Sequence, residues 1–389
     1  MKTQEHFLPF SRPSLGELEI EAVVACLRSG WLTTGPKAKQ FEQEFSKFVG
    51  AKYAVAINSA TAGLHLALEA FGIGPGDKIV TTPYTFTATA EVIRYLGADP
   101  LFVDIEPNYL SISASEIAKI DDENVKAVIP VHFAGQACEM DALLAIAGER
   151  GWRVIEDAAH ALPATHNGRM IGTLGDVTVY SFYANKTITT GEGGMLVTDN
   201  RSVAERARQM RLHGISRDVF DRYTAKTPSW YYEVVAPGFK YNMTDLAAVI
   251  GIQQLKKADA FQRRRSWIAR RYTDALQGLP LKTPQTRNES DIHSWHLYVI
   301  QLELESLRIN RDEFIEYMAA AGIGTSVHFI PLHIQPYWRD RYNHSPEDFP
   351  VAYDVYRRAV SLPIYPSMSD ADVERVIRAV EVVLGRYGR

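Results

Sequence analysis

The sequence predicts an α/β protein with a mostly parallel central sheet in a large domain and a smaller C-terminal α+β domain. From Tyr53 onward, short apolar runs alternate with helical patterns, which indicates a parallel sheet covered on both faces. Near Gly251 this alternation stops and a long basic helical stretch begins. With 389 residues, 46% of them hydrophobic and 23% charged, the chain is long and apolar enough for both domains.

The residues before the first strand are expected to form two helices. An irregular N-terminal segment, expected to wrap onto another part of the molecule, leads into a helix over residues 17–28 that ends at Gly30. After a loop, Pro36 suits the first turn of the second helix. Phenylalanines recur in that helix at spacings of four and three residues, which predicts an apolar stripe toward the core: Phe41, Phe45 and Phe48.

The large domain continues as strands and helices in alternation. The expected strands cover residues 53–57, 78–82, 101–103, 127–131, 153–156, 177–183 and 195–198. The expected helices cover residues 61–71, 86–96 and 141–149. Sheets of this kind bind ligands beyond the carboxyl ends of their strands, so the residues that carry function should come just after strands.

We place the domain boundary so that the large domain covers residues 1–252 and the small domain residues 253–389, and the N-terminal segment may pack on the small domain. The small domain is expected to hold a basic helix over 252–272, strands over 297–302 and 325–329, and helices over 311–321 and from Ala371. The arginines of the basic helix are interpreted as a solvated face rather than an anion site.

Composition and charge exclude several classes of protein. The net charge of −4 argues against a nucleic-acid-binding protein, which usually has a basic excess. Cys26 and Cys138 are too few for a disulfide framework, and no His or Cys spacing suggests a metal site. No apolar run approaches the ~18 residues that span a bilayer, and the N-terminus lacks a signal-peptide apolar region. We therefore expect a cytoplasmic protein without a membrane or nucleic-acid partner.

The segment over residues 177–199 holds the most informative residue, Lys186. Two β-rich runs bracket a polar loop in which Lys186 is followed by Gly191, Gly193 and Gly194. Burial would disfavour the ammonium form of such a lysine and lower its pKa, so that it could form a Schiff base with a carbonyl compound. The segment by itself favours the alternative, an ordinary loop lysine beside a glycine hairpin.

Three other strand ends carry candidate site residues. Ala60 and Thr61 open a helix whose free N–H groups could bind an anion, although the same pattern would serve as an N-cap. Phe86 could offer its flat face to an aromatic ligand, or it could belong to the core. Asp157 follows an apolar strand, and its carboxylate can be buried only beside a cation or a hydrogen-bond donor. It could instead be an N-cap with a satisfied His160 nearby.

Together these strand ends match the contacts that pyridoxal 5′-phosphate (PLP) needs. Ser181 lies five residues before Lys186, and its hydroxyl could bind phosphate. A phosphate site, an aromatic plate, an acid and an amine then follow successive strands. A protonated pyridine nitrogen would satisfy the acid and become a better electron sink.

Three motifs resemble the DegT/DnrJ/EryC1/StrS family of PLP-dependent aminotransferases. They are E-D-A-A-H-A (156–161), S-F-Y-A-N-K-T-I-T-T-G-E-G-G (181–194) and G-F-K-Y-N-M-T-D-L (238–246). The resemblance covers nearly the whole chain, including W-L-T-T-G-P-K-A-K-Q-F-E (31–42) and H-F-I-P-L-H (328–333). It implies a fold-type-I PLP-dependent transferase that acts on nucleotide-linked keto sugars.

The resemblance also implies roles for individual residues. Lys186 would form the Schiff base, Asp157 would pair with the pyridine nitrogen, Phe86 would stack on the ring and His160 would lie against the cofactor. The cofactor phosphate would be bound by Ala60, Thr61 and Ser181, and by Asn242 from the neighbouring subunit. Substrate contacts are expected from Thr33 and His328.

Histidine at position 160, where many relatives carry glutamine, makes the chain similar to the branch of the UDP-4-amino-4-deoxy-L-arabinose aminotransferase. The implied reaction moves the amino group of L-glutamate to a keto nucleotide sugar, with a UDP-4-keto sugar as the expected acceptor, for cell-surface glycan or lipid A type sugars. Two alternatives are a PLP- or PMP-dependent sugar dehydratase of the same fold, in which histidine replaces the lysine, and a non-catalytic regulator that binds PLP or a sugar nucleotide.

The expected assembly is a homodimer with composite active sites. The segment 230–242 is rich in Trp, Tyr and Phe, and a monomer could not easily hide so much aromatic surface in a loop. Family resemblance adds that Asn242 crosses the two-fold axis to the neighbouring cofactor.

Overall fold

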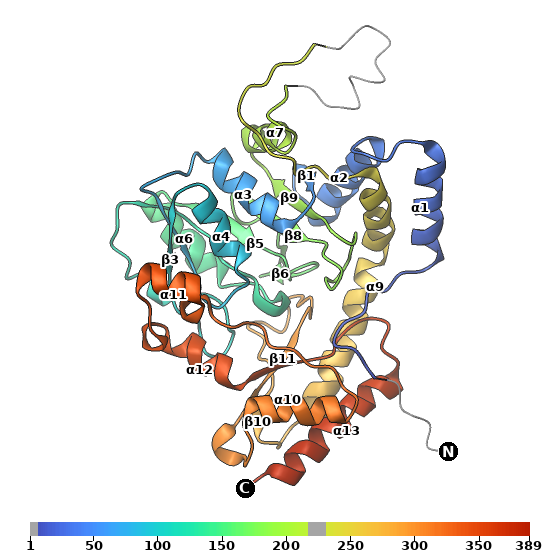
Figure 1. Cartoon of the computed structure of the whole chain (residues 1–389), viewed down its shortest axis with the longest axis vertical. Coiled ribbons are helices and arrows are strands. Elements are labelled where there is room, and N and C mark those ends of the chain that lie inside the picture. The colour runs from blue at the N-terminus through green and yellow to red at the C-terminus, as the bar shows by residue number, and fades with distance from the viewer. Residues whose placement is uncertain (1–6, 217–230) are drawn as a thin grey trace.

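The computed structural model describes residues 7–216 and 231–389, and its large part is built on a seven-stranded sheet (Figure 1). The strand order is β1-β9-β8-β5-β4-β2-β3, in which β9 runs antiparallel to both neighbours and the remaining pairs are parallel. The strands are β1 (Tyr53–Ile57), β2 (Lys78–Thr81), β3 (Asp99–Phe102), β4 (Val125–Val128), β5 (Arg153–Asp157), β8 (Val177–Ser181) and β9 (Gly194–Thr198). The expected mostly parallel central sheet is confirmed.

Helices cover both faces of this sheet. On one face α2 (Pro36–Val49), α6 (Met140–Arg150) and α9 (Asp245–Ala275) bury side chains such as Tyr180. On the other face α3 (Ala60–Ala70), α4 (Ala88–Tyr95) and α7 (Arg201–Met210) pack against the alternate residues, such as Val179. This alternation follows from the two-residue period of a strand. The short elements of this part are α5 (Ala114–Ile117), η1 (Phe133–Gly135), β6 (Thr165–His166) and β7 (Arg169–Met170).

The N-terminal residues pack against α9 and against the C-terminal part of the chain. Helix α1 (Glu17–Ser29) packs along α9 at the edge of the molecule (Figure 1). Ahead of it, the N–H group of Leu8 donates to the carbonyl of Gly322 at 2.8 Å, and the N–H group of Gly324 donates back to Leu8 at 2.8 Å.

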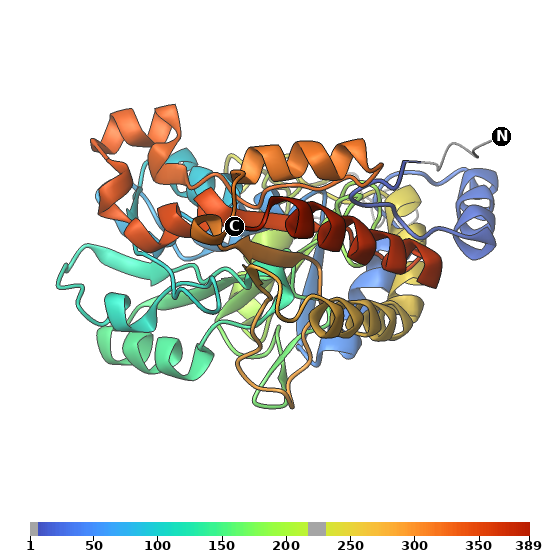
Figure 2. The same cartoon turned by 90° about the horizontal axis from the view of Figure 1, so that it is seen from below.

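The C-terminal part is organised around a three-stranded antiparallel sheet of β10 (Leu281–Lys282), β11 (Tyr298–Leu302) and β12 (Ala359–Leu362). Helices α10 (Arg311–Ala320) and α13 (Asp370–Tyr387) lie side by side and share one core with the end of α9 (Figure 2). The remaining elements are η2 (Leu304–Ser306), η3 (Leu332–Ile334), α11 (Pro336–Tyr342), η4 (Pro346–Asp348) and α12 (Pro350–Arg358).

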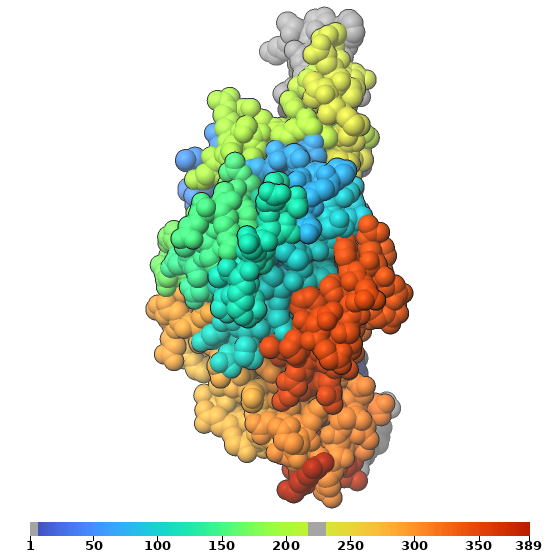
Figure 3. Space-filling view, turned by 90° about the vertical axis from the view of Figure 1, so that its left-hand side faces the viewer, coloured from blue at the N-terminus to red at the C-terminus, as the bar shows by residue number. Residues whose placement is uncertain are grey.

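Helices α11 and α12 reach back to the large sheet. Trp338 and Phe349 pack with Phe102 at the end of β3 in one buried cluster. In the space-filling view these orange helices lie against the teal surface of the large part (Figure 3). The C-terminal part therefore contacts the large sheet through α11 and α12.

Several details differ from the expectations. The strand expected over 325–329 is wrong, because this segment is extended but makes only the isolated bridge of Ser326 with Ser361. The third strand of the small sheet is instead β12, which was not predicted from the sequence. The interpretation of all helix arginines as solvated is also wrong for Arg265, which is buried.

The predicted boundary between residues 252 and 253 falls inside α9, which runs without a break from one part to the other. The division into two domains stays a prediction. Among the helices of the described residues, none is both long and apolar enough to cross a membrane.

Candidate active site

The candidate site lies beyond the carboxyl ends of β5 and β8. Asp157 is the last residue of β5 and Ser181 is the last residue of β8, and these two strands are neighbours in the sheet. Lys186 follows in the loop that leads to β9, where its N–H group donates to the carbonyl of Tyr183. Parallel strands therefore bring an acid, a hydroxyl and an amine to one edge of the sheet, as predicted for this fold.

Lys186 is a half-buried amine without a close anion. No hydrogen bond or ion pair reaches its Nζ atom from any residue in the described part of the chain. Burial lowers the pKa of Lys186 to about 8, although the carboxylate of Asp157 acts in the opposite direction. A substantial fraction of this side chain is thus the neutral, nucleophilic amine near neutral pH.

Asp157 is buried, and two donors hold its carboxylate. Thr89 donates its hydroxyl to Oδ2 at 2.8 Å, and the N–H group of Ala159 donates to Oδ1 at 3.1 Å. Burial raises the pKa of Asp157, while these hydrogen bonds and the charge of Lys186 oppose the rise. The net increase shows that the carboxylate lacks a full counter-charge in this environment. Thr89 was missed because a threonine inside a helix carries no sequence signal of its own.

His160 is buried and lies three residues after Asp157, in the turn that follows β5. Its Nδ1 atom accepts the N–H group of Ala134 at 3.3 Å, and its carbonyl accepts the hydroxyl of Ser294 at 2.5 Å. The ring of Phe329 stacks on it at 6.0 Å with an interplanar angle of 25°. Burial lowers the pKa of His160 well below its usual value, and the nearby Lys186 and His328 lower it further, so the ring is neutral.

Phe86 presents an open aromatic face at the mouth of the site. It is 61% exposed and precedes α4 instead of starting it, so the alternative of a core phenylalanine is not supported. Its ring centroid lies 6.2 Å from that of Phe329. A cavity of about 830 Å³ begins at these two rings and continues along α4 and α11, where Tyr95 and Tyr337 are also exposed.

The N-terminus of α3 lies beside the site. Ser59 caps this helix by accepting the N–H group of Ala62 at 3.1 Å, so the N-cap reading holds for Ser59. Ala60 and Thr61 form the first turn. Gly194 of β9 packs so closely that a Cβ atom there would lie 2.8 Å from the N atom of Ala60. Ser181 pairs with Gly194 in the sheet, so Gly194 lies between the last residue of β8 and the first turn of α3.

The three remaining predicted residues occupy different positions. His328 lies with the central group; its Nδ1 contacts the hydroxyl of Ser361 at 2.8 Å, and burial together with Lys186 lowers its pKa to about 4. Asn242 bridges to Ile57 at the end of β1 and donates to Thr34 at 2.6 Å within its own chain. Thr33 is exposed on the loop between α1 and α2, and its carbonyl accepts the N–H group of Asp245 at 3.1 Å.

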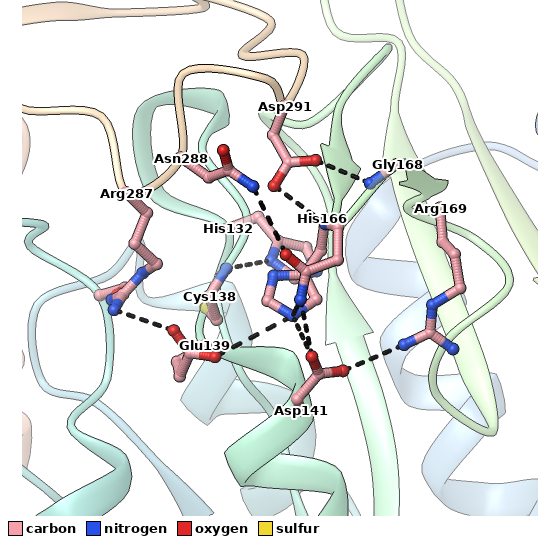
Figure 4. A network of polar contacts seen from close by, with 12 residues as sticks. His132, Cys138, Glu139, Asp141, His166, Gly168, Arg169, Arg287, Asn288 and Asp291 are labelled. Atoms are coloured by element: carbon pink, nitrogen blue, oxygen red, sulfur yellow. Dashed lines mark hydrogen bonds and ion pairs between the residues drawn. The ribbon is translucent and has the colours of Figure 1, made fainter.

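A second group of polar side chains lies at the start of α6 (Figure 4). Atoms of Glu139, Asp141 and His166 approach within 4.8 Å of one another, as metal ligands would. The guanidinium of Arg169 lies 3.1 Å from Asp141, and that of Arg287 lies 3.4 Å from Glu139. Arg287 also pairs with Glu106 at 2.7 Å, so the two guanidiniums are shared among three carboxylates. The expectation that no metal takes part stays a prediction.

Comparison with known proteins places this fold among sugar aminotransferases. The spore coat polysaccharide biosynthesis protein SpsC of Bacillus subtilis (strain 168) is 50% identical over 386 residues, covering 99% of each chain. The putative sugar aminotransferase Spr1654 from Streptococcus pneumoniae in its PMP form superposes with a TM-score of 0.91 at 32% identity, covering 97% of this chain and 99% of that one. Helicobacter pylori PseC, an aminotransferase involved in the biosynthesis of pseudoaminic acid, gives 0.90 at 27% identity, covering 98% and 100%.

The relatives are sugar aminotransferases of several kinds, so the narrower likeness to the L-arabinose branch stays a prediction. The expected α/β transferase fold is confirmed by these superpositions. The model of the DegT/DnrJ/EryC1/StrS aminotransferase family matches residues 13–381. The chain belongs to the DegT/DnrJ/EryC1/StrS aminotransferase family.

Proposed function

We propose that the protein is a PLP-dependent aminotransferase that moves the amino group of L-glutamate to a keto nucleotide sugar. A UDP-4-keto sugar is the proposed acceptor, as in the L-arabinose branch, and the product would serve cell-surface polysaccharide or lipid A type sugars. The observation that carries the proposal is the half-buried amine of Lys186, with its lowered pKa, beside the buried carboxylate of Asp157 in a chain of this family.

The residues present fit PLP. Asp157 is a buried carboxylate that lacks a full counter-charge, which a pyridinium would supply. Phe86 offers an exposed aromatic face, and the first turn of α3 with Ser181 offers donors for a phosphate. The relative Spr1654 is known in PLP and PMP forms, which agrees with this fit. PLP, when bound, supplies an electron sink through which an amino group passes from donor to acceptor.

Each side chain then has a separate task. Lys186 would hold the cofactor covalently through Nζ and, once released, would move a proton at the reacting carbon of the substrate as acid and base. Asp157 would keep the ring nitrogen protonated. His160, neutral and fixed by Ala134, would lie against the cofactor without adding charge. Phe86 would orient the ring by stacking on it.

The cavity beside Phe86 supports a large acceptor. Its volume of about 830 Å³ is within the range of small-molecule sites, and it opens directly from the proposed cofactor position. We propose that the sugar nucleotide lies along it, with His328 in contact with the sugar. Thr33 is also proposed to contact the substrate.

We also propose a cytoplasmic homodimer in which Asn242 of one subunit contacts the cofactor phosphate of the other. Support comes from the exposed apolar residues Tyr231, Tyr232, Val234 and Val235. The segment that follows residue 230, yellow in Figures 1 and 3, lies at one end of the molecule. Trp230, which belongs to the aromatic segment predicted as an interface, lies outside the described residues.

The test is a spectrum followed by a substrate screen. L-glutamate should change the absorbance of the PLP-loaded protein and release 2-oxoglutarate, and one of a panel of 4-keto and 3-keto UDP-, dTDP- and GDP-sugars should then restore the spectrum and gain an amino group. Loss of water from the sugar without amination would support the dehydratase. A spectrum that no amino donor changes would support the non-catalytic regulator.

A further inference from the structure

His296 is a buried imidazole next to the proposed site, and no role has yet been given to it. Its side chain is 4% exposed, and its ring centroid lies 4.3 Å from that of His160. Its Nδ1 atom is buried without any hydrogen-bond partner in the described part of the chain. An unpaired buried polar atom costs about 1–3 kcal/mol. An aliphatic side chain would fill the same space without that cost, so packing alone does not explain the imidazole.

The backbone that carries His296 is held in place from two sides. On the side of the large sheet, the N–H group of Leu297 donates to the carbonyl of Ala134 at 3.2 Å, and Ser294 donates to His160. Between these residues, Trp295 adopts a φ of 51°, a left-handed conformation that is unfavourable for a bulky side chain. Such conformations persist where the surrounding structure enforces them, often at functional sites.

On the other side, Arg265 of α9 holds the same backbone. This buried guanidinium donates to the carbonyls of Trp295 at 3.0 Å, His296 at 3.3 Å and Ile364 at 2.8 Å. No carboxylate pairs with it among the residues that the structure describes, and burial lowers the pKa of Arg265 to about 10. All three bonds come from one nitrogen, Nη1, while Nε has no partner in the described part of the chain, so Arg265 ties the backbone of residues 295 and 296 to that of residue 364.

We infer that His296 is a positioning residue for the proposed reaction: its ring packs on that of His160 and holds it in one orientation. In that orientation His160 takes the tautomer with the proton on Nε2. The tautomer follows from the N–H group of Ala134, which donates to Nδ1 of His160 and leaves Nε2 as the protonated atom. His296 closes the space on one side of this ring, and Phe329 closes another. The inference rests on the proposed function, because the orientation of His160 matters only beside a bound cofactor.

A double-mutant cycle on cofactor binding tests this inference. The variants are His160→Ala, His296→Ala and the double variant, and the readouts are the Kd of PLP for the cofactor-free protein and the pH midpoint of the bound cofactor's absorbance. We expect His296→Ala to weaken PLP binding about tenfold and to shift the midpoint in the same direction as His160→Ala. In the His160→Ala background, adding His296→Ala should change the Kd of PLP by no more than about twofold and should leave the pH midpoint unchanged, because the effects of coupled residues are not additive.

His296→Gln and His333→Ala separate positioning from loss of stability. Glutamine keeps most of the volume and a polar end, so it should restore part of the wild-type Kd and midpoint. His333 is equally buried and both of its ring nitrogens lack partners, but it packs with Phe349 away from Lys186. His333→Ala should therefore lower stability without changing the midpoint.

The outcomes are distinguishable. Effects of His160→Ala and His296→Ala that multiply in the double variant would overturn the inference and leave the proposed function intact. The same holds if His296→Ala binds PLP with the wild-type Kd and midpoint, or if His333→Ala reproduces its effects. A wild-type protein that takes up no PLP would overturn the proposed function, and the inference with it.

Discussion

At the scale of single residues, the buried site holds several ionisable side chains of which few are charged. Lys186 influences three imidazoles, those of His160, His296 and His328, and each of them has a lowered pKa. Because the imidazoles are neutral, the ammonium of Lys186 and the carboxylate of Asp157 are the charged groups at the centre of the site. Because these two shift in opposite directions, the amine becomes easier to deprotonate and the acid harder to ionise.

Lys186 should be the lysine that reacts with PLP, and its reactivity should follow its own pKa. The neutral amine is the nucleophile, so the rate of covalent attachment should rise with pH and reach half its maximum near pH 8. Borohydride reduction followed by a peptide map measures both the site and the rate. Lys186→Ala should fold and lose both halves of the transamination. Reduced cofactor found mainly on another lysine would refute the assignment.

Asp157→Asn should separate the electronic role from binding. The amide cannot hold a pyridinium charge, so k_cat should fall by orders of magnitude while PLP remains bound. The cofactor-free variant should also be more stable than the wild type at pH 7. The folded-state pKa of Asp157 is raised, so its ionisation destabilises the fold as pH rises through that pKa, and asparagine removes this effect.

Two measurements check these expectations for Asp157→Asn. Thermal unfolding without PLP should show the gain of the variant shrinking as the pH falls toward the usual range of an aspartate. Near-normal k_cat at full cofactor occupancy would instead mean that Asp157 is a structural residue.

At the scale of elements, the close contact between β9 and α3 shapes the proposed phosphate site. A Cβ atom on Gly194 would lie 2.8 Å from backbone atoms of Ser59, Ala60 and Tyr180, none of which can move like a flexible side chain. Gly194→Ala should therefore push β9 away from the first turn of α3, weaken PLP binding at least about tenfold and cost about 1–3 kcal/mol of stability.

Gly148→Ala is the matched control. Gly148 lies inside α6 with nothing within 4 Å of a built Cβ, so alanine should leave PLP binding unchanged and stabilise the helix by about 0.5–1 kcal/mol. Pyridoxal, which lacks the phosphate, should bind both variants equally. If Gly194→Ala binds PLP as the wild type does, the first turn of α3 is not the phosphate site.

Elements near the sheet were predictable from sequence because their signals are local. Asp157 and Ser181 end neighbouring strands, Lys186 follows Ser181 in the next loop, and the chain order of the strands already indicates a shared edge. Thr89 and His296 were not predictable, because they reach the site from a helix and from a segment more than a hundred residues away in the chain.

The errors in the C-terminal part have the same origin. Residues 325–329 have strand-like composition, but the place beside β11 is taken by β12, and pairing of that kind is decided by tertiary contacts. Arg265 sits within a run of arginines that is otherwise typical of a solvated face. Only the carbonyls of residues 295, 296 and 364 make its burial possible.

At the scale of the whole molecule, α9 connects the two parts of the chain. Its first residue, Asp245, accepts N–H groups from Gly35, Lys37 and Ala38 and so anchors the N-terminus of α2. Its far end packs in the core of the small sheet. Asn242 comes just before this helix. The residue proposed to contact the neighbouring subunit's cofactor is therefore attached to a helix that runs through both parts of the chain.

The proposed composite site can be tested by mixing two inactive proteins. Lys186→Ala removes the reactive amine, and Asn242→Asp should repel the partner's cofactor phosphate through its charge. A mixed dimer would contain one site with both changes and one with neither, so random pairing should restore roughly a quarter of the wild-type sites. Activity in the mixture, compared with each parent alone, measures this directly. If tagged subunits demonstrably exchange and activity does not return, each site is built within a single chain.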